Sequence, residues 1–500
     1  MPAFPERLSL RQKAFKKIAG AEDGRRRRED DAVQLRKQTR EEALRKKRMI
    51  NDQVQPVSAP SVQQCPMDCG VMPETLQMIM DLAQAIRSWS SCPQVQFLAV
   101  QQLRKLLNIA SDPPIEQVIS TGIVPHIVEF MKDMTKTGLQ IEAGWVLNII
   151  TSGMPEQTRA VVDAGALPVF MQLLESPHED VCEQAIWALG NIAGDSWKLR
   201  NLVIQSGGLD PILKSIRESK TASMMRNSTW VLSNLCRGRP HAPLEWVAPA
   251  LPTLSQLINS TDEEVLADAC WALACISDGE PERIDALIEA GACQRLVDLL
   301  DHASPMVQLP AVRAVGNIVL GDEAQTEAIL LCEPLPLFLR LLTHQNKSIK
   351  KEVCRAISNI MAGNSDQVQH VIDNGLIPAV IHLLRTAEYD IKREAAWVMR
   401  NATAYQVPEQ IKYFVQCDCI KPLVDLLSLP DVKGVGVALY ALEKILMVGQ
   451  SQQHQLSLSL NEIAALVEQA EGLRKIEALQ DNPNGVISSM AMKILDEQFP

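Results

Sequence analysis

The chain has 500 residues, about three times the length of an ordinary domain, so a single compact core is not expected. Hydrophobic residues make up 46% and charged residues 22%, as in a soluble folded protein, while only 4% aromatic residues favours a helical protein over a β-sandwich or barrel. No apolar run reaches the roughly 18 residues of a membrane span, and the N-terminus is charged, so we expect neither a transmembrane helix nor a standard secretory signal.

The first 55 residues form a basic arm. They hold 16 Lys and Arg against 9 Asp and Glu, although the whole chain has a net charge of −11. Two clusters of four cations lie in the arm: Arg25, Arg26, Arg27 and Arg28, and then Arg45, Lys46, Lys47 and Arg48. Such an arm binds either nucleic acid or an acidic protein surface, including the body of its own chain. Acidic residues interleaved with the cations favour the protein surface.

Residues 56–73 are expected to be a flexible linker, because this stretch has several Pro and almost no charge.

One pattern recurs through the rest of the chain. An aromatic residue or Arg, which we call the lead residue, is followed by two apolar residues, a small residue and often Asn. The lead residues are Trp145, Trp187, Trp230, Trp271, Arg313, Arg355, Trp397 and Tyr440, at spacings of 41 to 43 residues. So steady a period indicates tandem structural repeats.

Each period has the same internal order of helices. A short helix, a turn and a Leu-rich helix separate one lead helix from the next, and Gly165, Gly291 and Gly375 lie where a helix would end in a left-handed cap. Three helices in about 42 residues fit an all-α armadillo-repeat solenoid wound as a right-handed superhelix. We place this domain at residues 74–498, with its first repeat at 74–110 and its last at 461–498.

Stacking at a fixed period turns single positions into rows. A row of lead indoles should lie beside a row of amides four residues later, namely Asn191, Asn234, Asn317, Asn359 and Asn401. An amide can pair with both the N–H and the C=O of an extended peptide, and neighbouring indoles can hold an aliphatic stem that ends in a cation. The rows therefore predict a groove for an extended basic peptide. The alternative is that the indoles are core residues.

These motifs resemble those of the importin-alpha (karyopherin-alpha) family of nuclear import adaptors. The resemblance rests on the arm pattern RRRR…LRK…RKKR and on WALGNIAGD, NSTWVLSNLCRG, DACWALACISDG, RAVGNIVLGDE and REAAWVMRNAT, and it covers nearly the whole chain. It implies an autoinhibitory importin-beta-binding arm at 1–55 and about ten armadillo repeats. It also implies cargo with basic nuclear localisation signals, recycling by an export receptor of the CAS type, and shuttling between cytoplasm and nucleus. Cofactors and direct binding to nucleic acid or membranes are not expected.

The resemblance also implies two signal-binding sites. The residues that match the major site are Trp145, Gly153, Thr158, Trp187, Asn191, Asp195, Trp230 and Asn234, with Asp195 as the counter-charge of the key lysine. Those that match the minor site are Arg313, Val319, Gly321, Thr326, Glu352, Asn359, Glu394, Trp397 and Asn401.

Two positions depart from the family pattern. In the major site, Ile149 replaces an Asn and Asn148 stands one residue early, so one backbone contact is lost or displaced. In the minor site, Arg355 replaces a Trp, so a cation stands at the wall of a slot for cations and we expect that site to be weak. The alternative is that Arg355 pairs with a neighbouring carboxylate and its stem serves as the wall.

Two other classes of function are alternatives. An armadillo scaffold of the beta-catenin kind would bind acidic partners in a basic groove, which the acidic body and the Trp and Asn rows do not favour. An enzyme is not expected, because the eight His show no metal-ligand spacing and the chain has no phosphate-binding or nucleophile motif. The 12 Cys are interpreted as reduced thiols of the cytosol or nucleus.

Overall fold

The structure is a computed structural model that describes residues 73–88, 93–109, 113–456 and 460–499. The basic arm and nearly all of the linker lie outside these residues, and so do both cation clusters. The chain divides into two compact units between residues 253 and 254. We call the described residues up to 253 the early unit and those from 254 the late unit.

Both units are built from helices, and every regular element of the described residues is helical. The early unit contains α3 (Pro73–Arg87), α4 (Pro93–Ile109), α5 (Ile115–Ser120), α6 (Val124–Lys132), α7 (Thr137–Thr151), α8 (Pro155–Asp163), α9 (Ala166–Leu173), α10 (Glu179–Asp195), α11 (Trp197–Gln205), α12 (Leu209–Glu218), α13 (Ala222–Cys236), α14 (Leu244–Val247) and η1 (Ala248–Ala250). Helix α15 (Leu251–Leu257) crosses the division between the units.

The late unit is also built from successive short and long helices. It contains α16 (Glu263–Ile276), α17 (Pro281–Glu289), α18 (Cys293–Asp298), η2 (Leu299–Asp301), α19 (Pro305–Ile318), α20 (Glu323–Leu330), α21 (Leu335–Leu341), α22 (Lys347–Met361), α23 (Ser365–Asp373), α24 (Leu376–Thr386), α25 (Tyr389–Ala402), α26 (Pro408–Gln416), α27 (Ile420–Leu426), α28 (Val432–Leu456), α29 (Glu462–Gln469), α30 (Gly472–Ala478) and α31 (Gly485–Gln498).

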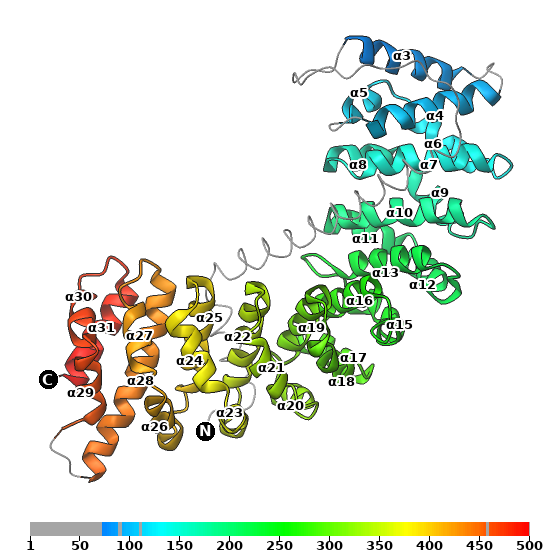
Figure 1. Ribbon diagram of the computed structural model, residues 1–500. Coiled ribbons are helices and arrows are strands. Elements are labelled where there is room, and N and C mark those ends of the chain that lie inside the picture. Colours follow the sequence, from blue (N-terminus) through cyan, green and yellow to red (C-terminus); the bar gives the residue numbers. More distant parts are fainter. Residues whose placement is uncertain (1–72, 89–92, 110–112, 457–459, 500) are drawn as a thin grey trace. The chain divides into compact units, whose positions relative to one another are not determined.

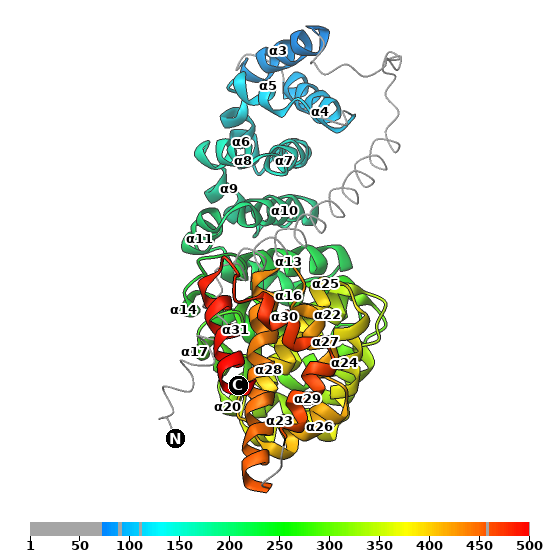
Figure 2. The ribbon, with the colours of Figure 1, turned by 90° about the vertical axis from the view of Figure 1, so that its left-hand side faces the viewer.

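Ten long helices stack in chain order, and all but α4 and α31 carry a lead residue. In the early unit α4, α7, α10 and α13 pack one on the next, and Figure 1 shows the first three as successive layers, which Figure 2 shows from the side. In the late unit α16, α19, α22, α25, α28 and α31 pack in the same way. We call these ten helices the third helices. The all-α armadillo-repeat solenoid predicted from the period is therefore confirmed.

A glycine lies in the turn before several of the Leu-rich helices. Gly165, Gly291 and Gly375 adopt φ angles of 79°, 71° and 71°, a left-handed conformation that disfavours residues with a Cβ atom. Gly165 and Gly375 directly precede α9 and α24, and the apolar faces of these two helices are buried in the stack. The left-handed caps predicted at these three positions are confirmed.

Helix α28 departs from the expected pattern. Gly449 lies inside α28, which runs on to Leu456. A Cβ at Gly449 would collide with Asn461, whose side chain caps the start of α29. Gly449 is therefore required for the close approach of α29 rather than for a helix end.

Candidate functional site

The asparagine row joins successive third helices. Each side-chain Nδ2 donates to a backbone carbonyl three residues after the lead residue of the preceding repeat. The bonds run from Asn191 to Asn148 (3.4 Å), Asn234 to Gly190 (3.0 Å), Asn317 to Ala274 (2.8 Å), Asn359 to Gly316 (2.7 Å) and Asn401 to Ser358 (2.9 Å). All five side chains are buried. Because a buried amide requires hydrogen-bond partners, this ladder gives the row a structural role in addition to any role in binding.

Among the described residues, two Oδ1 atoms of the row in the late unit accept from arginines, and those of the early unit do not. In the early unit no donor from the described residues reaches Oδ1 of Asn191 or Asn234. In the late unit Arg355 Nη2 donates to Oδ1 of Asn317 at 3.3 Å, and Arg400 Nη1 donates to Oδ1 of Asn401 at 3.1 Å. The early asparagines can therefore accept a peptide N–H, whereas Asn317 and Asn401 already accept from arginines of the same chain.

The lead tryptophans of the early unit pack between repeats. Trp145, Trp187 and Trp230 are 4–5% exposed. The rings of Trp145 and Trp187 lie 6.0 Å apart between centroids with an interplanar angle of 51°, which is a direct aromatic contact. The ring of Trp230 covers Gly190 so closely that a Cβ there would collide with it. The indoles thus contribute to packing, as the core interpretation expects, while forming the predicted row.

Thr158 and Asn191, both predicted for the major site, belong to one hydrogen-bond network. Thr158 Oγ1 donates to the carbonyl of Thr151 at 3.2 Å, and Asn191 Nδ2 donates to the Thr151 hydroxyl at 3.2 Å. Sequence reasoning missed Thr151. Thr151 could have been recognised by its position six residues after Trp145, from which it faces the next third helix.

The glycines of the two predicted sites share a local motif that sequence reasoning also missed. A Cβ at Gly153 would collide with Oε1 of Gln157, and a Cβ at Gly321 would collide with Oε1 of Gln325. Each Gln side chain accepts the backbone N–H of the residue after its glycine, at 2.9 and 3.0 Å. The motif can be recognised in the sequence as Gly, three further residues and Gln, and in both sites a Thr directly follows the Gln.

Asp195 is the last residue of α10 and is partly exposed. The carbonyl groups at the end of a helix make the local potential negative, which favours a cation beside this carboxylate. Arg237 supplies one cation nearby, since its Nη2 donates to the Gly194 carbonyl at 2.6 Å. A cargo lysine at Asp195 would therefore lie close to a resident guanidinium.

Asn148, the displaced amide of the second repeat, points into the stack. It is fully buried, and its Nδ2 donates to the backbone carbonyl and the Oε1 atom of Gln184 at 3.1 and 2.9 Å. Ile149, at the regular position of the row, is 2% exposed and carries no polar atom. The asparagine row of the early unit therefore begins at Asn191.

In the late unit, Glu352 lies between two arginines. Arg355 Nη2 is 2.7 Å from Glu352 Oε2, and Arg313 Nη1 is 3.8 Å from Glu352 Oε1. All three side chains are at most 7% exposed. The Glu352 carboxylate, which should attract a cargo cation, is thus already paired within the chain. The pairing of Arg355 agrees with that part of the alternative interpretation.

The other residues predicted for the minor site are also held by neighbours. Val319 is fully buried, and its carbonyl accepts from Thr326 Oγ1 at 3.3 Å. Glu394 is 9% exposed and lies 3.9 Å from Arg393 Nη2. The guanidinium of Arg400 lies 4.9 Å from the ring centroid of Trp397. Sequence reasoning missed Arg400, although a cation directly before Asn401 is visible in the sequence.

Family models match most of this chain. The armadillo/beta-catenin-like repeat matches residues 154–194, 198–237, 240–278, 280–320, 327–362 and 364–404, an atypical armadillo repeat matches 461–500, and an importin beta binding domain matches 11–101. Importin subunit alpha-1b of Oryza sativa subsp. japonica is 48% identical over 99% of this chain and 92% of its own length. The chain belongs to the importin-alpha family.

Further comparisons agree with this assignment. Importin subunit alpha-3 of Arabidopsis thaliana is 46% identical over 98% of this chain and 92% of its own length, and importin subunit alpha-B of Dictyostelium discoideum is 48% identical over 95% and 90%. The crystal structure of an engineered protein matches 84% of this chain and 98% of its own with a TM-score of 0.74 at 27% identity.

This importin-alpha chain is therefore a nuclear import adaptor with a domain that binds importin-beta, and it is not an enzyme. Within the described residues, no group of three His, Cys, Asp or Glu side chains could hold a metal ion. None of the described helices is long and apolar enough to cross a membrane. The nine cysteines that the structure describes are free thiols.

Proposed function

We propose that this importin-alpha chain binds the Lys/Arg-rich nuclear localisation signal of a cargo protein along the third helices of its early unit. The indoles of Trp145, Trp187 and Trp230 hold the aliphatic stems of the signal. Asn191 and Asn234 hold its backbone. The key lysine lies at Asp195, beside Gly153 and Thr158.

The available Oδ1 atoms of Asn191 and Asn234 carry this proposal. A groove that binds an extended peptide without regard to its sequence needs acceptors for the peptide N–H groups. These two atoms accept from no described residue, while the Nδ2 groups of the same side chains are held by the preceding repeat. The amides are thus fixed in orientation and still have capacity to accept, which lowers the entropy lost on binding.

A matched pair of double variants tests the proposal. Asn191→Ala with Asn234→Ala removes two ladder bonds and both available acceptors. Asn317→Ala with Asn401→Ala removes two equivalent ladder bonds whose Oδ1 atoms already accept from arginines. At about 1 kcal/mol for each hydrogen bond, the early double variant should bind a single-cluster basic peptide about thirtyfold more weakly. The late double variant should bind it as the parent does, and equal losses in both would contradict the proposal.

The N-terminal arm links this cargo to importin-beta. We place the importin-beta-binding segment at residues 1–55, and we propose that Arg45–Arg48 compete with cargo for the groove until importin-beta binds the arm. The importin beta binding domain matched at residues 11–101 supports the link. Tethering through residues 56–73 gives the competing cluster an effective concentration on the order of millimolar.

The late unit supplies a second and weaker signal site. We assign to it Arg313, Val319, Gly321, Thr326, Glu352, Asn359, Glu394, Trp397 and Asn401. After release of cargo in the nucleus, an export receptor of the CAS type returns the chain to the cytoplasm, so the protein shuttles. Membership of the importin-alpha family supports both steps. A fluorescently labelled chain should accumulate in the nucleus when that receptor is depleted, and an unchanged distribution would contradict the cycle.

A further inference from the structure

The guanidinium of Arg400 lies between two aromatic rings of successive third helices. Its Cζ atom is 4.9 Å from the ring centroid of Trp397 on α25 and 4.3 Å from that of Tyr440 on α28. Both rings are lead residues, so this is a slot between two members of the aromatic row. Arg400 Nη1 also donates to Asn401 Oδ1 at 3.1 Å.

Aromatic rings and one amide hold this cation without a carboxylate. None of the described Asp or Glu side chains lies within 4.0 Å of the Arg400 guanidinium, and desolvation by burial lowers the pKa of the group. A partly buried guanidinium close to two rings gains cation–π energy from both rings and loses part of its hydration. These are the contacts that a lysine or arginine of a basic signal would make with the same rings and amide.

Arg400 also occupies part of the hydrogen-bonding capacity of Asn401. Both the carbonyl and the hydroxyl of Ser358 accept from Asn401 Nδ2, at 2.9 and 3.0 Å, and Oδ1 accepts from Arg400. One acceptor position of this amide oxygen is thus occupied by a cation of the same chain. One side chain fills an aromatic slot and competes with a peptide N–H for the neighbouring amide.

We propose that Arg400 is a built-in substitute for a cargo cation, which closes the late signal site of this importin-alpha chain to the second basic cluster of a two-cluster signal. The proposal rests on the proposed function and deepens it by naming a specificity-determining residue. It is independent of Arg355, which lies on the preceding third helix and pairs with Glu352 instead. The chain therefore selects cargo mainly by the basic cluster bound at the early unit, and the late site contributes little.

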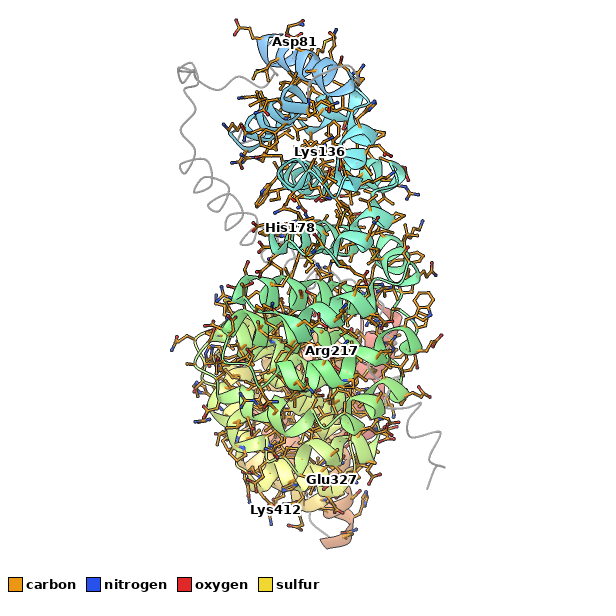
Figure 3. All side chains as sticks on the ribbon, turned by 90° about the vertical axis from the view of Figure 1, so that its right-hand side faces the viewer. Asp81, Lys136, His178, Arg217, Glu327 and Lys412 are labelled. Atoms are coloured by element: carbon orange, nitrogen blue, oxygen red, sulfur yellow. The ribbon has the colours of Figure 1, made fainter. Side chains whose placement is uncertain are left out.

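Binding of two peptides to the full chain saturated with importin-beta tests the proposal. One peptide carries two basic clusters, and the other has the upstream cluster replaced by alanines. Arg400→Thr should raise affinity for the two-cluster peptide about five- to tenfold and leave the one-cluster peptide unchanged. Arg400→Lys keeps the charge but not the planar stack, so its gain should be smaller. The control is Lys412→Gln, which removes a charge from the exposed face of α26 (Figure 3).

Each outcome decides one question. If Arg400→Thr gives no gain while the one-cluster peptide binds normally, the proposal is wrong. An equal gain in Lys412→Gln would also overturn it, because net charge would then explain the effect. If the one-cluster peptide fails to bind any variant, the proposed function fails instead. Should Arg400→Thr not fold, Arg400→Gln replaces it, since glutamine also removes the charge and keeps more of the side-chain volume.

Discussion

Replacing Arg355 by Trp is expected to strengthen the late signal site. Arg355 Nη2 now contacts Glu352 at 2.7 Å and donates to Asn317 Oδ1 at 3.3 Å, so the substitution releases a carboxylate and an amide acceptor at once. It also adds a ring face worth about 1 kcal/mol to a cargo cation. A released charge-assisted contact adds a similar amount, and the affinity for a two-cluster peptide should rise about five- to thirtyfold.

We expect the stack to accommodate the new indole. Gly316 occupies the same position in its repeat as Gly190, on which the ring of Trp230 lies. A tryptophan at 355 can therefore pack on Gly316 in the same manner. Glu352 loses its nearer partner but keeps Arg313 at 3.8 Å, so we expect the free energy of unfolding to fall by about 2 kcal/mol or less.

Isothermal titration calorimetry with one-cluster and two-cluster peptides, on chain saturated with importin-beta, measures the effect. Arg355→Gln is the matched control, because it removes the charge without adding a ring and should give only part of the gain. The one-cluster peptide should bind parent and variants alike. If Arg355→Trp leaves the two-cluster affinity unchanged in a folded protein, the Arg355 side chain does not limit the late site.

Four further predictions address other parts of the chain. Asp195→Lys should remove most of the affinity for a single-cluster peptide, because it places like charge at the proposed lysine pocket, and circular dichroism should show an intact fold. Deleting residues 1–69, or adding importin-beta, should strengthen cargo binding in a titration. Gly190→Ala should lower the free energy of unfolding by about 1–3 kcal/mol, measured by denaturant titration, because the new methyl group meets the ring of Trp230. Cys270 should resist iodoacetamide at pH 8 until the chain unfolds, since burial raises the pKa of its thiol to about 12.

Different results would contradict these four predictions. Retained binding by a folded Asp195→Lys variant would place the lysine pocket elsewhere. Equal cargo affinity of the full and truncated chains would exclude competition by the arm. An unchanged denaturation midpoint for Gly190→Ala would mean that Trp230 can move without loss, and rapid alkylation of native Cys270 would mean that its helix opens readily.

Much of the fold follows from local sequence. The period of the lead residues predicts the third helices, since each copy repeats the same apolar spacing over a helix length. Gly165 and Gly375 predict the left-handed turns before α9 and α24, because that conformation favours a residue without Cβ. Gly449 shows the limit of this reasoning. Its role depends on Asn461, which approaches it from a different helix.

The sequence by itself determined the repeat, the rows of lead residues and asparagines, and the family. Each of these depends on residue type and spacing within about 42 positions, which a pattern preserves. Only the tertiary structure decided what each polar atom binds. The Nδ2 group of Asn234 donates to the Gly190 carbonyl, and that of Asn148 donates to Gln184. Glu352 forms an ion pair with Arg355. Except for the Glu352–Arg355 pair, these contacts join residues of neighbouring repeats. Which atoms pair depends on the distance and angle between the stacked helices, and residue spacing does not encode these.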